Sequence, residues 1–379
     1  MAEHATLSAS GSAKWLTCPA SLAMESMGTL VDKGSEASRE GTAAHFLASE
    51  SLTHDISPMT YLGENIISDG ESPATWAYAG DRRVDENLFE VTEEMIEAVE
   101  IYIEYIQAQQ GINNFYETKV DYSHIAPGGF GTADALVETL RDDKGVLYVV
   151  DLKYGKGVRV DAFENSQGML YAVGALNSLG FLLDNDIKEI VVVIVQPRLQ
   201  HISEFQISVE DLNAWAEEEV RPKALVAHEL LDFMCSARRI STVVNAGKAE
   251  IALEHFNPTT KGCRWCKAKP VCRAVASQGY EAAIEGFEPV ANLADVVVKK
   301  ENLVNVNALT NEEIAAVYGK IKVFKDWAAG LQDLITKKIG DGEYIPGYKL
   351  IPTEGNRAWS LDDAETIKAL RTAGLQKKD

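Results

Sequence analysis

The sequence predicts an α/β fold with a mixed central sheet and helices on its faces. Two observations support this prediction. The middle of the chain alternates like β-strands between helically patterned regions, and its elements read strand–strand–strand–helix–strand. The 379 residues are 46% hydrophobic and 25% charged, which is a folded composition. This length predicts two domains, or one elaborated domain with an appendage.

The N-terminal part is predicted to be mainly helical. Thr92 can cap a long helix, and Glu93 and Glu94 suit the positive N-terminal end of that helix. The expected elements are a turn and short helix over residues 1–30, a loop over 31–40, a helix over 41–52, an irregular stretch over 53–90 and a long helix over 92–110.

The middle of the chain is rich in β-branched and aromatic residues, which favour strands. The polar residues 142–145 predict a hairpin turn between the second and third strands. The expected elements are strands over residues 115–122, 130–140 and 146–152, a helix over 163–179 and a strand over 189–196.

The C-terminal part is predicted to be helical around a basic, cysteine-rich loop. We take residues 1–275 as the first domain and 276–379 as a mainly helical extension with a small hairpin. The expected elements are helices over 209–244, the loop over 257–273, a poorly patterned stretch over 274–300, an amphipathic helix over 311–339, and a hairpin and short helix in the last forty residues.

Charge and cysteine usage exclude several classes of protein. With 36 basic and 57 acidic residues the net charge is -21, so a nucleic acid could bind only through a local basic groove. The apolar run 190–195 is too short for a membrane helix, and no signal peptide is recognisable, which predicts a cytoplasmic protein without a membrane partner. Five cysteines favour metal ligation or buried thiols over a disulfide scaffold.

Two acids and a lysine lie at corresponding places on two predicted strands. Asp151 and Lys153 share one face at the end of their strand, and a hairpin can bring Asp134 beside Asp151. Adjacent carboxylates repel each other unless a cation lies between them, and Mg²⁺ or Mn²⁺ suits an oxygen-rich site. A nearby lysine can stabilise developing negative charge or position a water, so the set suits phosphodiester hydrolysis.

Two helices add further candidate residues. His45 lies within the helix predicted over 41–52, where a neutral imidazole could be another metal ligand. Gln167 and Tyr171 are four residues apart, so they share a helix face directly after the lysine strand. Both side chains can hydrogen-bond a phosphate or a base without adding charge.

These motifs, in this order, resemble the PD-(D/E)XK nuclease superfamily in its RecB-type branch. The resemblance implies a restriction-endonuclease-like core over about residues 8–275, with Asp134, Asp151 and Lys153 catalytic and Gln167 and Tyr171 binding DNA. It also implies Mg²⁺ or Mn²⁺ bound by His45, Asp134 and Asp151, with Glu117 as an auxiliary catalytic acid. Ala133 stands where the superfamily's name has proline, a common departure.

Three cysteines, Cys263, Cys266 and Cys272, form a C-x2-C-x5-C run with metal-ligand spacing. Zinc and reduced thiols are the alternatives that the spacing leaves open. Together with Cys18, which precedes a proline, the run resembles the iron–sulfur subset of RecB/AddB-type nucleases. That resemblance implies a [4Fe–4S] cluster held by all four, with zinc as the alternative metal and Cys235 as an ordinary buried thiol.

The segment 261–273 is basic in an acidic chain. It either balances the charge of anionic thiolates or contacts phosphates. Trp15 and Trp265, close to cysteines in the sequence, either stack on bases or pack against the cluster. The basic side chains are Lys261, Arg264, Lys267, Lys269 and Arg273, of which we expect Lys261, Arg264 and Lys267 to bind substrate.

Together these features predict a metal-dependent DNA nuclease, most simply an exonuclease. The resemblance extends to phage and prophage proteins. It implies work on DNA ends, together with other replication or recombination proteins, in the cytoplasm of a bacterial host. The alternative is a catalytically silent nuclease fold that binds DNA or protein and is stapled by zinc or an iron–sulfur cluster.

Overall fold

The structure is a computed structural model that describes residues 5–26, 35–70, 72–78, 87–241, 251, 253–259, 262–272, 274–275, 277 and 311–350. The chain separates into two compact units, Met1–Trp327 and Ala328–Asp379. The boundary expected at 275/276 adjoins residues outside the description and stays a prediction. Among the described residues, no helix combines the length and apolarity needed to cross a membrane.

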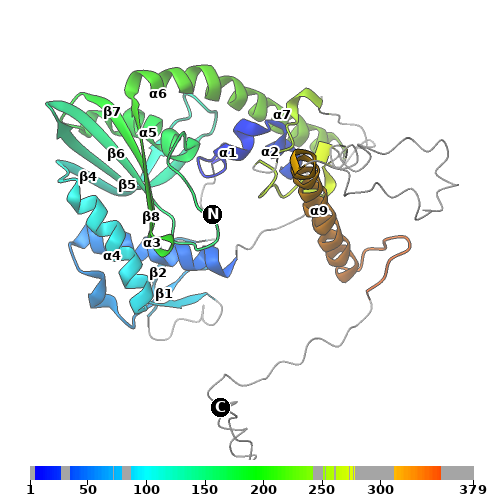
Figure 1. The fold of residues 1–379 in the computed structure, drawn as a ribbon, viewed down its shortest axis with the longest axis horizontal. Helices are drawn as coiled ribbons and strands as arrows, with labels where there is room; N and C mark the ends of the chain where they lie inside the picture. The colour runs from blue at the N-terminus through cyan, green and yellow to red at the C-terminus, as the bar shows by residue number, and fades with distance from the viewer. Residues whose placement is uncertain are drawn as a thin grey trace, which may run out of the picture. The chain divides into compact units, whose positions relative to one another are not determined.

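A mixed sheet forms the centre of the first unit, as the strand pattern predicts, and it has five strands where four were expected (Figure 1). Its order follows the sequence, and only β6 and β7 run parallel. Helix α5 makes the crossover that a parallel pair requires. The strands are β4 (Asn113–Asp121), β5 (Phe130–Arg141), β6 (Lys144–Leu152), β7 (Ile187–Gln196) and β8 (His201–Ser208).

Helices cover both faces of this sheet, and each face has its own apolar core (Figure 1). Helices α3 and α4 bury one face, whereas α1, α5, α6 and α7 pack on the other. The helices are α1 (Ser12–Thr17), α2 (Ala20–Ser26), α3 (Glu36–His54), α4 (Glu93–Ala108), α5 (Ser166–Leu179), α6 (Val209–Trp215), a π-helical turn (Ala216–Val220), α7 (Arg221–Ser241) and α9 (Asn311–Gly340).

Local sequence signals explain where several elements begin. The Thr92 side chain accepts a hydrogen bond from the Met95 amide and starts α4, which confirms the predicted cap. Asp142 and Asp143 both have positive φ, as a tight two-residue hairpin turn requires, and they join β5 to β6 at the predicted place.

Two sequence predictions are wrong, and one strand is missing from them. Residues 35–40 are not a loop, because Ser35 caps α3 and the helix begins at Glu36. The stretch 53–90 is not wholly irregular, since it contributes a small antiparallel sheet. Strand β8 was not predicted at all. The small sheet consists of β1 (Asn65–Ile67), β2 (Thr75–Trp76) and β3 (Leu88–Glu90).

The C-terminal helix confirms its prediction over 311–339 to within one residue. Residues 341–350 form turns without a strand. The rest of the predicted hairpin and the last short helix lie outside the described residues.

Candidate functional site

The pairing of the central sheet is interrupted around Asp134. Between β4 and β5 the register passes from Tyr116↔Ala135 to Thr118↔Ala133, and Glu117 lies opposite Asp134 with a φ of 43°. Such a backbone conformation is unfavourable for glutamate, and strain of this kind concentrates at functional sites. The break frees the side chains of both acids from a regular ladder.

Three ligand-bearing side chains meet at this break. His45 reaches over from α3, and its Nδ1 lies 3.4 Å from Asp134 Oδ1 and 3.8 Å from Glu117 Oε1. One nitrogen and two carboxylate oxygens therefore lie within 4.8 Å of one another. Histidine and carboxylates are a ligand set that divalent cations accept.

In the group of His45, Glu117 and Asp134, two carboxylates face one imidazole, and this arrangement shifts the pKa values of its members. Burial lowers the pKa of His45, but the Asp134 and Glu117 carboxylates raise it more, to about 10. Burial likewise raises the pKa of Asp134, yet the His45 imidazolium and Lys153 hold it below its ordinary value. The protonated imidazole thus supplies positive charge between two acids.

Asp151 and Lys153 form a second buried group on the neighbouring strand. The Asp151 carboxylate is 2% exposed, and its Oδ2 lies 2.6 Å from Lys153 Nζ. Burial raises the pKa of Asp151 despite the lysine. Burial also lowers the pKa of Lys153, but Asp151 and Asp134 raise it above its ordinary value. Lys153 is therefore a charged ammonium at neutral pH, and not a free base.

Gln167 holds this pair in place. Its Nε2 donates to Asp151 Oδ1 at 3.0 Å, and its Oε1 accepts from Lys153 Nζ at 3.3 Å. Asn165 caps α5 and accepts hydrogen bonds from the Gln167 and Gly168 amides, which sets the first turn of the helix beside β6. Gly168 permits this approach, since a Cβ there would lie 2.3 Å from Val192.

Tyr171 lies one helical turn further on and is largely buried, at 7% exposure. Its ring packs over Gly131, where a Cβ would lie 2.6 Å from the ring. The Gln167 amide donates to the Tyr171 hydroxyl at 3.2 Å. The helix face that carries Gln167 and Tyr171 therefore points at Asp151 and Lys153. Gln167 contacts both residues, and Tyr171 contacts Gln167.

An open pocket of about 660 Å³ adjoins the site. Its wall includes His45, Glu117 and Lys153, so the candidate ligands and the lysine are accessible from one side. The N-terminal turns of α3 and the glycine-containing loop after β6 complete most of the wall. The further lining residues are Ser35, Ala37, Ser38, Gly41, Thr42, Leu152, Tyr154, Gly155, Gly157, Val158, Val160, Gln196 and Trp265.

The structure thus brings the sequence-predicted acids and lysine together where the pairing of β5 and β6 ends, but with a different grouping. Glu117, expected as an auxiliary acid, joins His45 and Asp134. Asp151, expected as a metal ligand, is bound by Lys153 and Gln167. This different grouping follows from the positive φ of Glu117 and from the gap in the pairing of β4 and β5. Neither feature can be recognised in the sequence.

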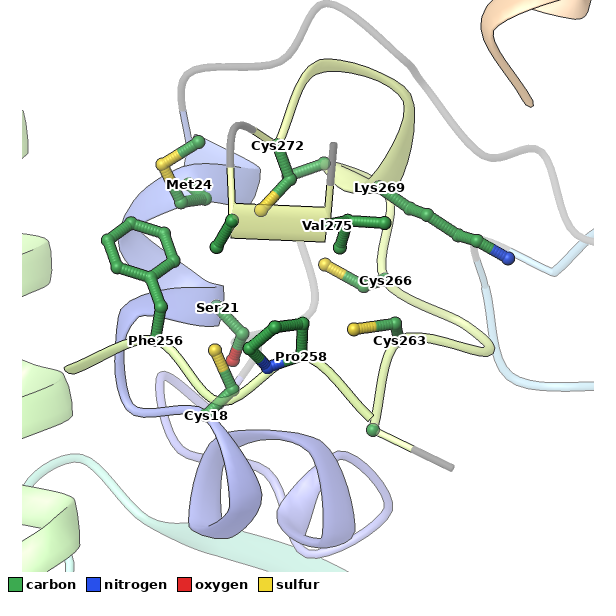
Figure 2. A pocket seen from close by; sticks show the side chains of 13 residues that line it. Cys18, Ser21, Met24, Phe256, Pro258, Cys263, Cys266, Lys269, Cys272 and Val275 are labelled. Atoms are coloured by element: carbon green, nitrogen blue, oxygen red, sulfur yellow. The ribbon is translucent and has the colours of Figure 1, made fainter. Parts of the chain in front are cut away.

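Four cysteines from distant parts of the chain line a second, small pocket. Figure 2 shows their sulfur atoms pointing into it, with Cys18 beside α2 and the others on the C-terminal loop. Burial raises the pKa of the Cys18, Cys263 and Cys266 thiols, the last to about 12, and neighbouring cysteines add to each shift. Sulfur ligands gathered in this way, one of them buried and three half-buried, fit a metal group.

Glu25 joins the two segments that carry these cysteines. Its carboxylate lies 2.6 Å from Lys14 Nζ and accepts a hydrogen bond from the Lys267 amide at 2.8 Å. Cys235 lies on α7 outside this pocket and is half-buried, so it is not the buried thiol that the resemblance implied.

The basic and aromatic residues near the cysteines separate into two groups. Trp15 is fully buried in the core, and its Nε1 donates to the Ser8 carbonyl, so base stacking by Trp15 is excluded. Trp265, Arg264 and Lys267 are exposed. The expected contacts of Lys261 and Arg273 lie outside the described residues.

Comparison with known proteins gives a family but no activity. One solved structure, described as "Crystal structure of SSO0001", matches at 11% identity with a TM-score of 0.21, over 60% of this chain and 94% of that chain. A likeness this low carries no argument about fold or function. The sequence matches the family described as "Protein of unknown function (DUF2800)" over residues 4–379, nearly the whole chain. The chain therefore belongs to the DUF2800 family.

Proposed function

We propose that this protein is a divalent-metal-dependent deoxyribonuclease. The observation that carries the proposal is the meeting of His45, Glu117 and Asp134 beside the buried Asp151–Lys153 pair. A cation such as Mg²⁺ or Mn²⁺ at this position would polarise a phosphoryl oxygen and make a bound water more acidic. Phosphodiester hydrolysis needs both effects.

The residues of the chain have distinct roles in this proposal. Glu117, Asp134 and the neutral form of His45 hold the cation, which displaces the proton that the imidazole otherwise carries, and Asp151 lies close enough to influence it. Lys153 remains protonated, so it acts by stabilising the negative charge that develops on the phosphate. Gln167 orients both Asp151 and Lys153 and keeps them at the edge of the pocket.

The motif order that resembles RecB-type nucleases supports the same reading. It favours an exonuclease that acts on DNA ends in replication or recombination. Such a substrate would place the protein in the cytoplasm of a bacterial host cell.

For the cysteine pocket we propose a [4Fe–4S] cluster with a structural role. Among the described residues, no three of the four sulfur atoms lie within 4.8 Å of one another. Four thiolates around one zinc ion, with Zn–S near ~2.3 Å, would place their sulfur atoms roughly 3.8 Å apart. The wider spacing favours a cluster over a single zinc ion, which remains the second candidate.

The chain contains its own control for the catalytic assignment. Asp186 and Lys188 belong to another D-x-K sequence, and their exposed side chains make an ion pair far from the acids of the site in the β6–β7 register. Asp151→Ala and Lys153→Ala should abolish cleavage of single-stranded and duplex DNA in Mg²⁺ or Mn²⁺. Asp186→Ala and Lys188→Ala should cleave like the wild type.

The measurement is the release of labelled nucleotides, with circular dichroism to check that each variant folds. Wild-type protein that binds DNA but cleaves none with either cation would favour the silent binding module. Full activity in both site variants would overturn the assignment.

A further inference from the structure

We infer that Trp265 is a stacking platform for an unpaired base next to the acidic site, so that the preferred substrate is a single strand or a frayed end. This inference rests on the proposed function. Trp265 lies between two cysteines of the small pocket, yet it lines the pocket that contains His45, Glu117 and Lys153. The cysteine loop therefore forms part of the wall of the candidate active site.

Exposure of this indole has no structural explanation among the described residues. Trp265 is 75% exposed, whereas Trp15, which also lies close to a cysteine in the sequence, is fully buried. Tryptophan exposes a large apolar face at a cost, and exposed aromatic groups in a pocket mark binding sites. A nucleobase is the flat partner that a DNA substrate offers.

The neighbouring charge suits a nucleotide better than a plain apolar ligand. The Arg264 guanidinium lies 5.4 Å from the centre of the Trp265 ring. Stacking on the indole and a positive charge close to the ring together match a base and its phosphate. Lys153, which lines the same pocket, provides a second cation near the acids.

The loop holds Trp265 in a defined position. The Cys263 amide donates to the Thr259 carbonyl at 2.9 Å, and the Lys267 amide donates to Glu25 at 2.8 Å. Cys263 and Cys266, which flank Arg264 and Trp265 in the sequence, are directed into the small pocket (Figure 2). An anchored loop loses little freedom on binding, so a stacked base would retain most of its binding energy.

A base is able to stack on Trp265 only when it is not enclosed in a duplex. Stacking platforms in single-strand-binding proteins work in this way and tolerate any sequence. The geometry therefore favours an unpaired nucleotide beside the scissile phosphate.

The test measures binding of a fluorescein-labelled oligothymidylate and a blunt hairpin duplex, by anisotropy, in EDTA so that neither is cleaved. The protein is the full chain, purified anaerobically with its cysteine-bound metal. Trp265→Ala should weaken oligothymidylate binding roughly 5- to 150-fold, the range expected for one lost stacking contact. Trp265→Phe should retain most of the affinity, and duplex binding should change little.

Phe181→Ala, which removes an exposed aromatic side chain from another part of the surface, is the control and should bind like the wild type. Metal content should be equal in all variants. Unchanged oligothymidylate binding by Trp265→Ala would overturn the stacking inference, as would equal weakening for both DNAs. If wild-type protein still cleaves DNA in either case, the proposed nuclease activity stands. If the wild type binds and cleaves neither DNA, both proposals fall.

Discussion

The side chain of Asp134 accepts a hydrogen bond from the backbone amide of Leu152, with 2.8 Å between Oδ2 and the nitrogen. The ladder between β5 and β6 ends at Ala135↔Val150, so this bond takes over where backbone pairing stops. The other carboxylate oxygen of Asp134 faces His45 at 3.4 Å. One acid thus fastens the strand that carries Asp151 and also belongs to the candidate metal site.

These two roles of Asp134 are separable by substitution. Asp134→Asn keeps an oxygen that can accept from the buried Leu152 amide, whereas Asp134→Ala leaves that amide without its partner. Both variants should lose cation affinity. The free energy of unfolding in EDTA, from urea denaturation, should be lower for Asp134→Ala than for Asp134→Asn by about 1–3 kcal/mol. Equal stability of the two variants would show that the hydrogen bond contributes nothing.

Features set by neighbouring residues were the ones that could be predicted from the sequence. Thr92 caps α4, and Asp142 and Asp143 make the hairpin turn, because each depends on only a few adjacent residues. Ser35, directly before Glu36, is also a capping signal and could have located the start of α3. Strands β5, β6 and β7 carry long apolar or alternating runs, which made them recognisable.

Features that depend on distant pairing could not be predicted. The φ of Glu117 is set by the register of β4 on β5, and nothing in the residues around Glu117 indicates it. Strands β1 to β3 have two or three residues each, too few to show a period. In β8 burial alternates regularly, but polar His201 and Ser203 take half-buried positions and apolar Ile202 is exposed, so the sequence shows no clear apolar period.

The residues of the candidate site divide in the same way, into those that local spacing predicts and those whose place depends on the whole fold. Asp151, Lys153 and Gln167 were identified from spacing, because a strand and the next helix keep them in a fixed relation. The different exposures of Trp15 and Trp265 could not be predicted, because both residues lie within a few positions of a cysteine in the sequence. Only the fold shows that one belongs to the core and the other to a pocket.

Glu138 should make stability depend on pH. It is fully buried and accepts hydrogen bonds from Asn113, Asp184 and Asn185. Burial raises its pKa, but these donors bring it below the ordinary value of 4.5. A carboxyl group with a lowered folded-state pKa contributes stability above its unfolded pKa and loses that contribution as the pH falls through the folded value.

Glu138→Gln should therefore unfold with about 1.5–3 kcal/mol less free energy than the wild type at pH 7, as expected for lost hydrogen bonds to a charged acceptor. The difference should narrow as the pH falls below the ordinary value of 4.5. Urea unfolding across this pH range measures it. Glu97→Gln, on the exposed face of α4, is the control and should show a small difference at every pH. A constant difference for Glu138→Gln would contradict the linkage.

DNA binding should depend on salt through a few local contacts, because the net charge of -21 opposes any long-range attraction. Arg264→Ala and Lys267→Ala should each weaken binding of an oligothymidylate and lower the slope of log K against log salt by about 1. Lys188→Ala, remote from the pocket, should leave the slope unchanged. Binding that does not respond to salt would remove these two side chains from the phosphate contacts.

The cysteine pocket allows the sharpest test of the metal group, because its four thiols come from two segments that are far apart in the sequence. Cys18 lies at the end of α1, and the other three belong to the C-terminal loop. A metal held by both segments closes a very long loop, so the entropy of the unfolded chain favours a large stabilising effect. Cys18→Ala should thus lose the metal as fully as Cys263→Ala, Cys266→Ala or Cys272→Ala. Cys235→Ala, outside the pocket, should keep it.

Anaerobically purified wild-type protein should be brown and contain about four irons and four sulfides per chain, as a [4Fe–4S] cluster requires. Iron and zinc analysis, with the visible absorption spectrum, measures this for the wild type and each variant. Stoichiometric zinc without iron would replace the cluster by a zinc site but leave the four ligands in place. Metal retained at full occupancy in Cys18→Ala would instead exclude the N-terminal cysteine, and with it the closure of the two segments by a shared metal.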